Sequence, residues 1–354
     1  MPKRAKPSQP VEKWKQPTLA QCMRVPQPLP PRVILPCTAT ASEADLNNDD
    51  RVRVVDLFCG IGGWSEGSRQ AGSRVTLAVD CDTSLLQIHA RNHAGCQHMR
   101  MELGPKTEER LVEQIHRRIP EGCKWHLHAS PPCTAISTIR SSTRTRDVHE
   151  GMRLVLWYIA LVLRLRPTTW SMEEVGTGML DGVLAMAQHL HPDTVAFASD
   201  VPLEIYGVPQ SRKRTLAGTP RLVARFQTNP SLRADAPVLS AVLAPPKGAT
   251  IVKGAAGKCV DPARTVVHAD GSKTNDTPIR LMKSVHELCY TCLAGNPHYW
   301  CRDNFTTIRR FNTQEQAALQ CFPRDYKFGA IGDSITGIGN AVPCLVARKF
   351  MEGI

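Results

Sequence analysis

The chain has 354 residues, of which 42% are hydrophobic and 21% are charged. This composition is typical of a globular protein with a sizeable core, and it excludes a wholly disordered, collagen-like or coiled-coil chain. Lysine and arginine number 44 against 32 acidic residues, a net charge of +12, which favours a polyanionic partner and nucleic acid before any other.

The apolar runs and the cysteines of the sequence indicate the compartment of the protein and the redox state of its thiols. No apolar run approaches the ~20 residues of a membrane-spanning helix, and the first ten residues lack the apolar stretch of a secretory signal. We therefore expect an intracellular monomer without a membrane partner, nuclear if eukaryotic and otherwise cytoplasmic. Thirteen cysteines scattered from Cys22 to Cys344 indicate reduced thiols rather than a disulfide framework.

The chain begins with a basic, proline-rich arm. Residues 1–36 hold nine prolines and seven lysines or arginines against one acidic residue, and their apolar residues follow no helical or strand period. The composition predicts a disordered arm over residues 1–50.

Regular patterns then predict a doubly wound sheet. A β-branched strand over 51–58 leads into a glycine-rich turn, a helix over 64–71 and a second strand over 75–79 that ends in Asp80. Further expected elements are a strand over 125–129, a buried helix over 151–166 and a strand over 168–173. We assign residues 51–218 to this core.

The character changes after residue 218. Residues 219–305 carry eleven basic and six acidic residues, many prolines and few regular periods, so we expect a separate, loop-rich, basic domain. Helical patterns return at 313–319 and from Val342, and we assign residues 306–354 to a segment that returns to the core.

Two short motifs at the ends of predicted strands indicate functional residues. Asp56-Leu-Phe-Cys-Gly60-Ile-Gly62-Gly63 would let the backbone approach a nucleotide-like ligand, with Asp80 placed for ribose hydroxyls. The turn lacks the spacing of a phosphate-binding loop, so a nucleoside such as S-adenosylmethionine fits better than ATP. Ser130-Pro131-Pro132-Cys133 places a thiol past the end of another strand, although one cysteine among thirteen is more often a buried apolar residue.

These sequences, together with Glu173-Glu-Val175, Gln210-Ser-Arg-Lys-Arg214 and Gly339-Asn-Ala-Val-Pro343, occur in the order and rough spacing of the cytosine-C5 DNA methyltransferase family. The resemblance covers residues 51–354 apart from the basic domain. It implies an α/β fold, namely the Rossmann-like doubly wound mixed sheet of class I methyltransferases, with a smaller inserted target-recognition domain at 219–305.

The resemblance also implies a reaction. Methyl transfer from S-adenosylmethionine to C5 of a flipped-out cytosine in duplex DNA would use Cys133 as the nucleophile that adds to C6. Glu173 would act at N3, and Arg212 and Arg214 would hold the pyrimidine O2 and steady the catalytic groups.

Further roles are carried over from the family by motif. Residues expected to bind the cofactor are Asp56, Phe58, Gly60, Gly62, Asp80, Glu102, Pro131, Asn340 and Val342. Residues expected to contact the substrate are Ser137, Arg140, Arg144, Arg146 and Gln210. Trp64 is expected to pack its helix rather than to contact the cofactor.

Two departures from the family leave alternatives open. Thr134 stands where the family commonly has Gln, and Glu174 stands where it commonly has Asn. An ionised carboxylate only accepts hydrogen bonds and could repel charge at Glu173, so a DNA-binding homologue with reduced or lost turnover is one alternative. The other is the same chemistry on tRNA, because Cys321-Phe322 partly resembles the RNA-directed branch.

A metal site is the less favoured interpretation of one cysteine cluster. Cys289, Cys292, His298 and Cys301, with His286 upstream, have enough ligand types for zinc. Their spacing matches no known finger, so free thiols and surface histidines are the preferred interpretation.

Overall fold

The structure is a computed structural model that describes residues 50–132, 145–253, 266–267, 273–274, 283–294, 298–302 and 307–354. The basic arm up to residue 49 and the segment 133–144 therefore lie outside the described residues. Among the described helices, none combines the length and hydropathy that a membrane crossing needs.

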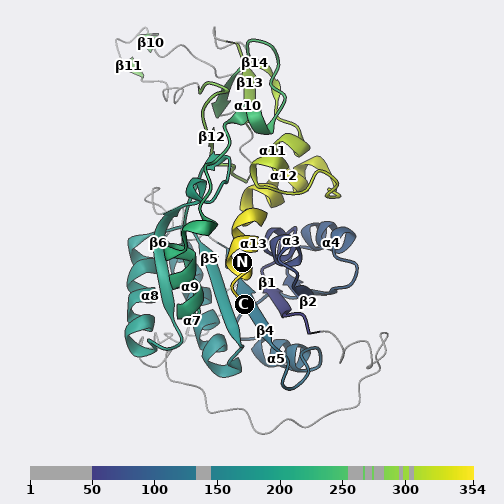
Figure 1. Ribbon diagram of the computed structural model, residues 1–354, viewed down its shortest axis with the longest axis vertical. Helices are drawn as coiled ribbons and strands as arrows, with labels where there is room; N and C mark the ends of the chain where they lie inside the picture. Colours follow the sequence, from purple (N-terminus) through teal and green to yellow (C-terminus); the bar gives the residue numbers. More distant parts are fainter. Residues whose placement is uncertain are drawn as a thin grey trace, which may run out of the picture.

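The described core is built on a seven-stranded sheet in the order β3-β2-β1-β4-β5-β8-β6 (Figure 1). Its strands are β1 (Arg53–Leu57), β2 (Arg74–Asp80), β3 (Gln97–Arg100), β4 (Trp125–Ala129), β5 (Thr169–Glu174), β6 (Ala196–Pro202) and β8 (Lys213–Gly218). Neighbouring strands are parallel except at β8, which is antiparallel to both β5 and β6. The expected α/β fold with a mixed, doubly wound sheet is confirmed.

Helices cover both faces of this sheet. One face is covered by α5 (Glu108–His116), α7 (Thr145–Leu165) and α8 (Gly178–Leu190). The other is covered by α3 (Gly63–Gln70), α4 (Thr83–Asn92), α9 (Pro220–Thr228) and α13 (Cys344–Met351). Strand residues alternate between the faces, so each strand serves two cores.

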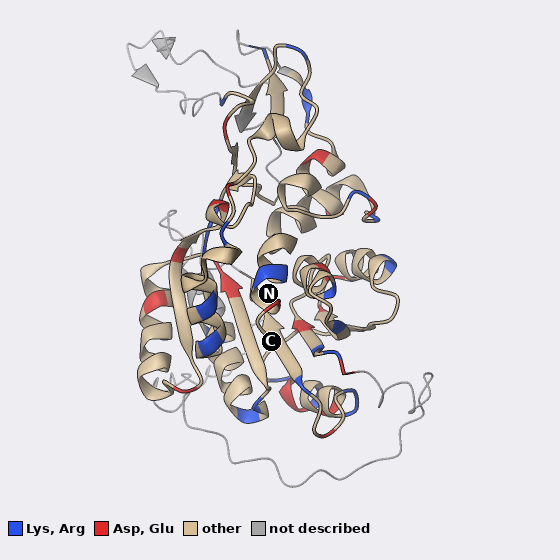
Figure 2. Ribbon diagram, viewed as in Figure 1, with Lys and Arg blue, Asp and Glu red and all other residues tan. Residues whose placement is uncertain are grey.

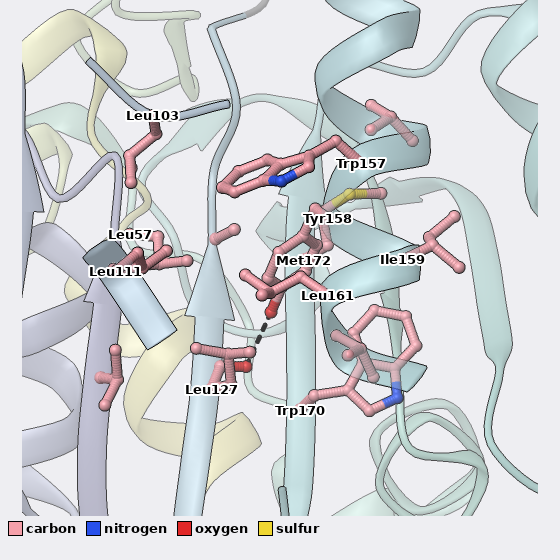
Figure 3. Packing of buried hydrophobic residues seen from close by; sticks show 14 of the residues in the cluster. Leu57, Leu103, Leu111, Leu127, Trp157, Tyr158, Ile159, Leu161, Trp170 and Met172 are labelled. Carbon is pink, nitrogen blue, oxygen red and sulfur yellow. Dashed lines mark hydrogen bonds between the residues drawn. The ribbon is translucent and has the colours of Figure 1, made fainter. Parts of the chain in front are cut away.

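The face under α7 is apolar. Leu127 of β4 and Met172 of β5 are fully buried there against Tyr158 and Leu161 of α7 (Figure 3). The Tyr158 hydroxyl is satisfied because it donates to the carbonyl oxygen of Leu127 at 2.8 Å. Burial of this kind contributes about 25 cal/mol for each Å² of apolar surface removed from water.

A smaller lobe lies beyond the edge of the core at which strands β1, β4 and β5 end (Figure 1). Its sheet has the order β14-β13-β9, and Trp300 stacks on Phe311 at 4.4 Å in its core. The elements of the lobe and its connections are β7 (Gln210–Ser211), η2 (Leu203–Ile205), η3 (Pro230–Leu232), α10 (Leu239–Val242), β9 (Thr250–Lys253), β10 (Val266–Val267), β11 (Lys273–Thr274), β12 (Cys289–Tyr290), β13 (His298–Cys301) and β14 (Thr307–Arg310).

The structure draws the boundaries of this lobe differently from the expected 219–305. Helix α9 packs through Phe226 onto Phe350 of α13, so it belongs to the core. Strand β14 pairs with β13, so the lobe extends to Arg310. The last segment forms α11 (Thr313–Leu319) and α12 (Ile331–Asn340) and returns to the core in α13.

Candidate active site

The ends of three neighbouring parallel strands bring the predicted motifs together. Leu57 pairs with Ala129, and Ala129 pairs with Met172, so β1, β4 and β5 end level with one another. The glycine-rich turn, the Pro131-Pro132 segment and the acidic end of β5 therefore meet at one edge of the sheet. The acidic end of β5 is red in Figure 2. Ligands of open α/β sheets bind at this carboxyl edge.

The glycine-rich turn is held by Asp80. One carboxylate oxygen accepts a hydrogen bond from the Gly60 amide at 2.8 Å, and the other accepts from the Asp82 amide at 2.8 Å. Burial raises the pKa of Asp80 above its usual value, whereas these two amides lower it. Asp80 thus fixes the turn and stays partly exposed at the edge where a ligand would lie.

Two positions in the turn need an unusual backbone. Gly62 has φ +96°, and a Cβ there would lie 2.8 Å from His89 Cδ2 and 2.9 Å from the Tyr326 hydroxyl, so a side chain does not fit. Phe58 has φ +57° without being glycine, and its ring meets Trp157 edge-on at 6.4 Å. Such backbone strain concentrates at functional sites.

Asp56 supports the turn from below rather than lining it. The residue is fully buried, and its Oδ2 accepts a hydrogen bond from Ser65 Oγ at 2.6 Å. Burial, with the nearby Asp80 charge adding to it, raises the pKa of Asp56 to about 7. The expected direct contact between Asp56 and the cofactor is corrected accordingly, because a fully buried carboxyl presents no surface to a ligand.

A histidine relay continues from Asp56, and the sequence reasoning missed it. Ser65 Oγ lies 2.9 Å from His89 Nε2, and His89 Nδ1 lies 2.8 Å from His98 Nε2. With Ser65 donating to Asp56, His89 must carry its proton on Nε2 and accept from His98. Burial lowers the pKa of His89 well below its usual value, so the relay is uncharged at this point.

The C-terminal segment closes over the same turn. A Cβ at Gly63 would lie 2.2 Å from the carbonyl oxygen of Val342, so these two backbones touch. Val342 is buried and Asn340 is exposed at the end of α12. The Tyr326 hydroxyl donates to the carbonyl oxygen of Ile61, which ties the loop after α11 to the turn.

Glu173 and Arg214 form a nearly buried ion pair beside the turn. Arg214 Nε lies 2.9 Å from Glu173 Oε1, close enough for an ion pair but not aligned as a hydrogen bond. The guanidinium also donates from Nη1 to the carbonyl oxygen of Lys213 at 2.7 Å. Only 4% of Glu173 is exposed, so the ion pair is largely shielded from solvent.

Arg212 has a different environment from the one its motif suggests. Its guanidinium donates to the carbonyl oxygens of Cys292 at 2.9 Å and Ala341 at 3.2 Å, with longer contacts to Gly339 at 3.4 Å. The side chain is 1% exposed. Through its two terminal nitrogens, Arg212 therefore joins the lobe to the C-terminal segment, an environment that differs from the pyrimidine contact expected from its motif.

Gln210 belongs to the same junction. Its Nε2 donates to the Leu319 carbonyl at 2.7 Å and to Gln320 Oε1 at 2.9 Å, and its Oε1 accepts from the Cys292 amide at 2.8 Å. Gln210 is fully buried, so the structure assigns it to the junction rather than to a surface that contacts substrate.

The other predicted residues fall into three groups. Pro131 is buried and Glu102 is exposed, both near the carboxyl edge, where Asp80 of β2 pairs with Arg100 of β3. Arg146 lies in α7, but its side chain is outside the described part. Four residues lie outside the described residues altogether: Cys133, Ser137, Arg140 and Arg144.

The zinc candidates are not assembled into a site. Among the described residues, no group of three or more His, Cys, Asp or Glu side chains is placed to hold a metal ion. Cys292 Sγ instead lies 3.2 Å from Gln316 Oε1, and His298 packs against the rings of Tyr290 and Phe311. These contacts serve packing and hydrogen bonding.

Two buried histidines of β4 were also missed. His128 stacks on Trp64 with ring centroids 3.6 Å apart, and both His126 Nε2 and His128 Nδ1 lie 2.8 Å from Ser171 Oγ. Burial lowers the pKa of His126 to about 3. The alternating Trp-His-Leu-His-Ala sequence of a buried strand is the signal that could have identified them. Trp64 packs α3, as expected.

Known proteins resemble this chain over most of its length. The sequence model of the C-5 cytosine-specific DNA methylase family matches residues 52–219 and 257–354. The type II methyltransferase M.HgiDI of Herpetosiphon aurantiacus is 29% identical over 308 residues, which are 84% of this chain and 92% of that protein. M.NgoPII of Neisseria gonorrhoeae is 24% identical over 350 residues, covering 86% and 95%.

Solved structures share the fold. A putative DNA modification methyltransferase encoded within an E. coli prophage gives a TM-score of 0.56 at 19% identity, covering 85% of this chain and 98% of the other. The S. pombe Dnmt2 methyltransferase gives 0.53 at 14% identity, covering 84% and 96%. With the family match extending over both the core and the C-terminal segment, the chain belongs to the C-5 cytosine-specific DNA methylase family.

Proposed function

We propose that the carboxyl edge of the sheet carries out the reaction of the family, methyl transfer from S-adenosylmethionine to C5 of cytosine in DNA, with Cys133 as nucleophile and Glu173 and Arg214 beside it. The observation that carries this proposal is the Glu173–Arg214 ion pair. It stands at the end of β5, next to the strand β4 after which Pro132 leads into Cys133.

The cofactor turn fits a nucleoside that carries no phosphate. Gly60 and Gly62 have positive φ and leave the backbone uncovered by side chains, and the partly exposed Asp80 carboxylate can accept hydrogen bonds from ribose hydroxyls. Phe58 and Val342 supply apolar walls. When bound, S-adenosylmethionine supplies an electrophilic methyl group.

The chain's own residues would activate the pyrimidine. The Cys133 thiolate forms a bond to C6, which moves electron density onto C5 and toward N3. Glu173, once it carries a proton, would share or donate that proton at N3 and so stabilise the density, and it would take the proton back when the ring is restored. After C5 is methylated, loss of the C5 proton to a base and cleavage of the S–C6 bond restore the ring and the thiolate.

The substrate must present an unstacked base, because a cytosine inside a duplex hides C6 and C5. The segment 134–146, with Ser137 and three arginines, would contact the flipped nucleotide and its phosphates. The lobe that carries β9, β13 and β14 would read the flanking sequence. Residues 229–310, from the end of α9 to the end of β14, carry 11 basic and 6 acidic residues, a net charge of +5 that favours phosphate contacts.

Methyl transfer to duplex DNA and to tRNA, measured side by side with labelled S-adenosylmethionine, tests this proposal. We expect label in DNA alone, its loss in Cys133→Ala, and its retention in the control Cys123→Ala. Bisulfite sequencing of the labelled DNA then gives the target sequence. Label in tRNA alone would reject DNA as the substrate, and full activity of Cys133→Ala would reject the nucleophile.

A further inference from the structure

Two carboxyl groups lie next to each other at the end of β5. Glu173 has Arg214 within 2.9 Å, whereas Glu174 is 1% exposed and receives only the amide of Val175, at 2.6 Å from its Oε2. In the described part of the chain, Glu174 Oε1 is buried without a hydrogen-bond partner. The Glu174 carboxyl group is therefore buried with one of its two oxygens, Oε1, not hydrogen-bonded to any described residue.

Among the described residues, no cation is paired with Glu174. Its own strand contributes the negative Glu173, and β8 contributes Arg214, which already serves Glu173 and the Lys213 carbonyl. On the side of β6, Asp200 Oδ1 lies 2.5 Å from where a Cβ of Gly176 would be, so a further carboxylate approaches this end of the strand. A buried carboxylate without a cation is strongly disfavoured relative to its protonated form.

Thr215 lies across from Glu174 on β8 and also has a buried hydrogen-bonding group that no described residue uses. The two residues are register partners across β5 and β8, and the group is Oγ1 of Thr215. Oγ1 of Thr215 lies 3.1 Å from the same Cβ position of Gly176 that Asp200 approaches. A protonated Glu174 would have a donor to offer at this place, whereas an ionised one would have none.

We propose that Glu174 is a positioning residue that works as a neutral acid, accepting from the Val175 amide through Oε2 and donating its proton from Oε1 toward Thr215. Burial, and then the adjacent Glu173, raise the pKa of Glu174 well above its usual value, in agreement with this charge state. A neutral acid offers a donor and an acceptor, as an amide does, and it leaves Arg214 to pair with Glu173 alone. Only this last consequence rests on the proposed function.

Thermal unfolding of Glu174→Gln and wild type across pH 5 to 8.5 tests the charge state without any activity. A carboxyl group whose folded pKa is raised takes up a proton on folding, so wild type loses stability as pH rises above the unfolded pKa of ~4.3. Gln takes up none. The melting temperature of the variant relative to wild type should therefore rise by about 2 °C for each pH unit in this range.

The exposed Glu121 provides a matched control, since Glu121→Gln should show no such trend. A constant or falling difference for Glu174→Gln would show that Glu174 is ionised in the fold and would overturn the proposal. Failure of Glu174→Gln to fold at neutral pH would overturn it as well, because the amide and the neutral acid are equivalent in shape and hydrogen bonding. If methyl transfer is observed, the ratio of variant to wild-type kcat should rise with pH on the alkaline side. A ratio that does not rise would reject the link to the Glu173–Arg214 pair.

Discussion

The two faces of the central sheet differ in chemistry although the same strands build both. The face under α7 buries Leu127 and Met172 in a continuous apolar cluster. The face under α3 buries Asp56, His128 and Ser171 instead. His128 is hydrogen-bonded to Ser171 and stacks on Trp64, and Asp56 accepts a hydrogen bond from Ser65. Because side chains alternate along a strand, neighbouring residues belong to different cores.

The difference indicates that the two faces have separate roles. The apolar face supplies stability through burial. On the polar face, burial shifts the pKa values of Asp56 and His128 in the direction that favours their neutral forms, and the face leads to the edge where the glycine-rich turn and Glu173 lie. Buried polar groups are tolerated only when hydrogen-bonded, so this face constrains geometry more than it adds stability. A substitution on the polar face should therefore lower activity, whereas a substitution of the adjacent residue on the apolar face should lower the free energy of unfolding.

The largest effect is expected at Glu173. Glu173→Gln removes the carboxyl group that pairs with Arg214 and that would act at N3, so kcat for methyl transfer to DNA should fall by about 100-fold or more. Cofactor affinity should change little, since Glu173 is not part of the turn. Unchanged kcat, measured in a single-turnover assay, would remove Glu173 from the mechanism.

The adjacent Met172 should respond in the opposite way. Met172→Ala opens a cavity in the apolar cluster and should lower the free energy of unfolding by about 2–5 kcal/mol. Denaturant unfolding measures this loss, and kcat per folded molecule should stay close to wild type. A large fall in kcat with unchanged stability would mean that the two faces are not separated as described.

The loss of folding stability at low pH should arise from buried histidines of the polar face. The pKa of His126 is lowered to about 3 by burial, so below pH 6.5 the unfolded chain binds a proton that the folded chain does not. Stability is therefore lost as pH falls, by about 1.4 kcal/mol per pH unit for this residue. In His126→Gln the slope between pH 6.5 and 4.5 should shrink by about one proton, and in the exposed control His286→Gln it should not.

The smallest effect is expected at Tyr326. Tyr326→Phe removes the hydroxyl that donates to the Ile61 carbonyl in the cofactor turn. A lost hydrogen bond of this kind is worth about 0.5–1.5 kcal/mol, so the Kd for S-adenosylmethionine should rise about 2- to 10-fold. Tyr206→Phe is the matched control, because its hydroxyl donates to the Phe226 carbonyl at 2.9 Å, away from the turn. An equal change of Kd in both variants would contradict a specific role for Tyr326.

Local patterns predicted much of the core. The strand over 125–129 and the helix over 313–319 have the predicted bounds, because a proline pair and a turn end the first and an asparagine capping box starts the second. Helix α7 starts at Thr145 rather than at 151, since its first turns are polar and carry no apolar period. The family motifs also identified the glycine-rich turn and the residues Glu173 and Arg214, which the structure pairs.

Roles that depend on contacts between distant segments could not be predicted in this way. Arg212 reaches carbonyls 80 and 127 residues away, and Gln210 reaches one 109 residues away. The histidine relay joins residues from two helices and a strand around His89. No short sequence window contains these partners, and the family motif alone places Arg212 and Gln210 at the substrate.

The most direct test of the account is to trap the covalent adduct. Duplex DNA that carries 5-fluorocytosine at the methylated position cannot lose its C5 substituent as a proton, so an active chain supplied with S-adenosylmethionine should remain bonded to it through Cys133. We expect a complex that survives denaturing electrophoresis, is absent in Cys133→Ala and maps by mass spectrometry to the peptide containing Cys133. Tight binding without any denaturant-resistant complex, or a complex through another residue, would contradict the account.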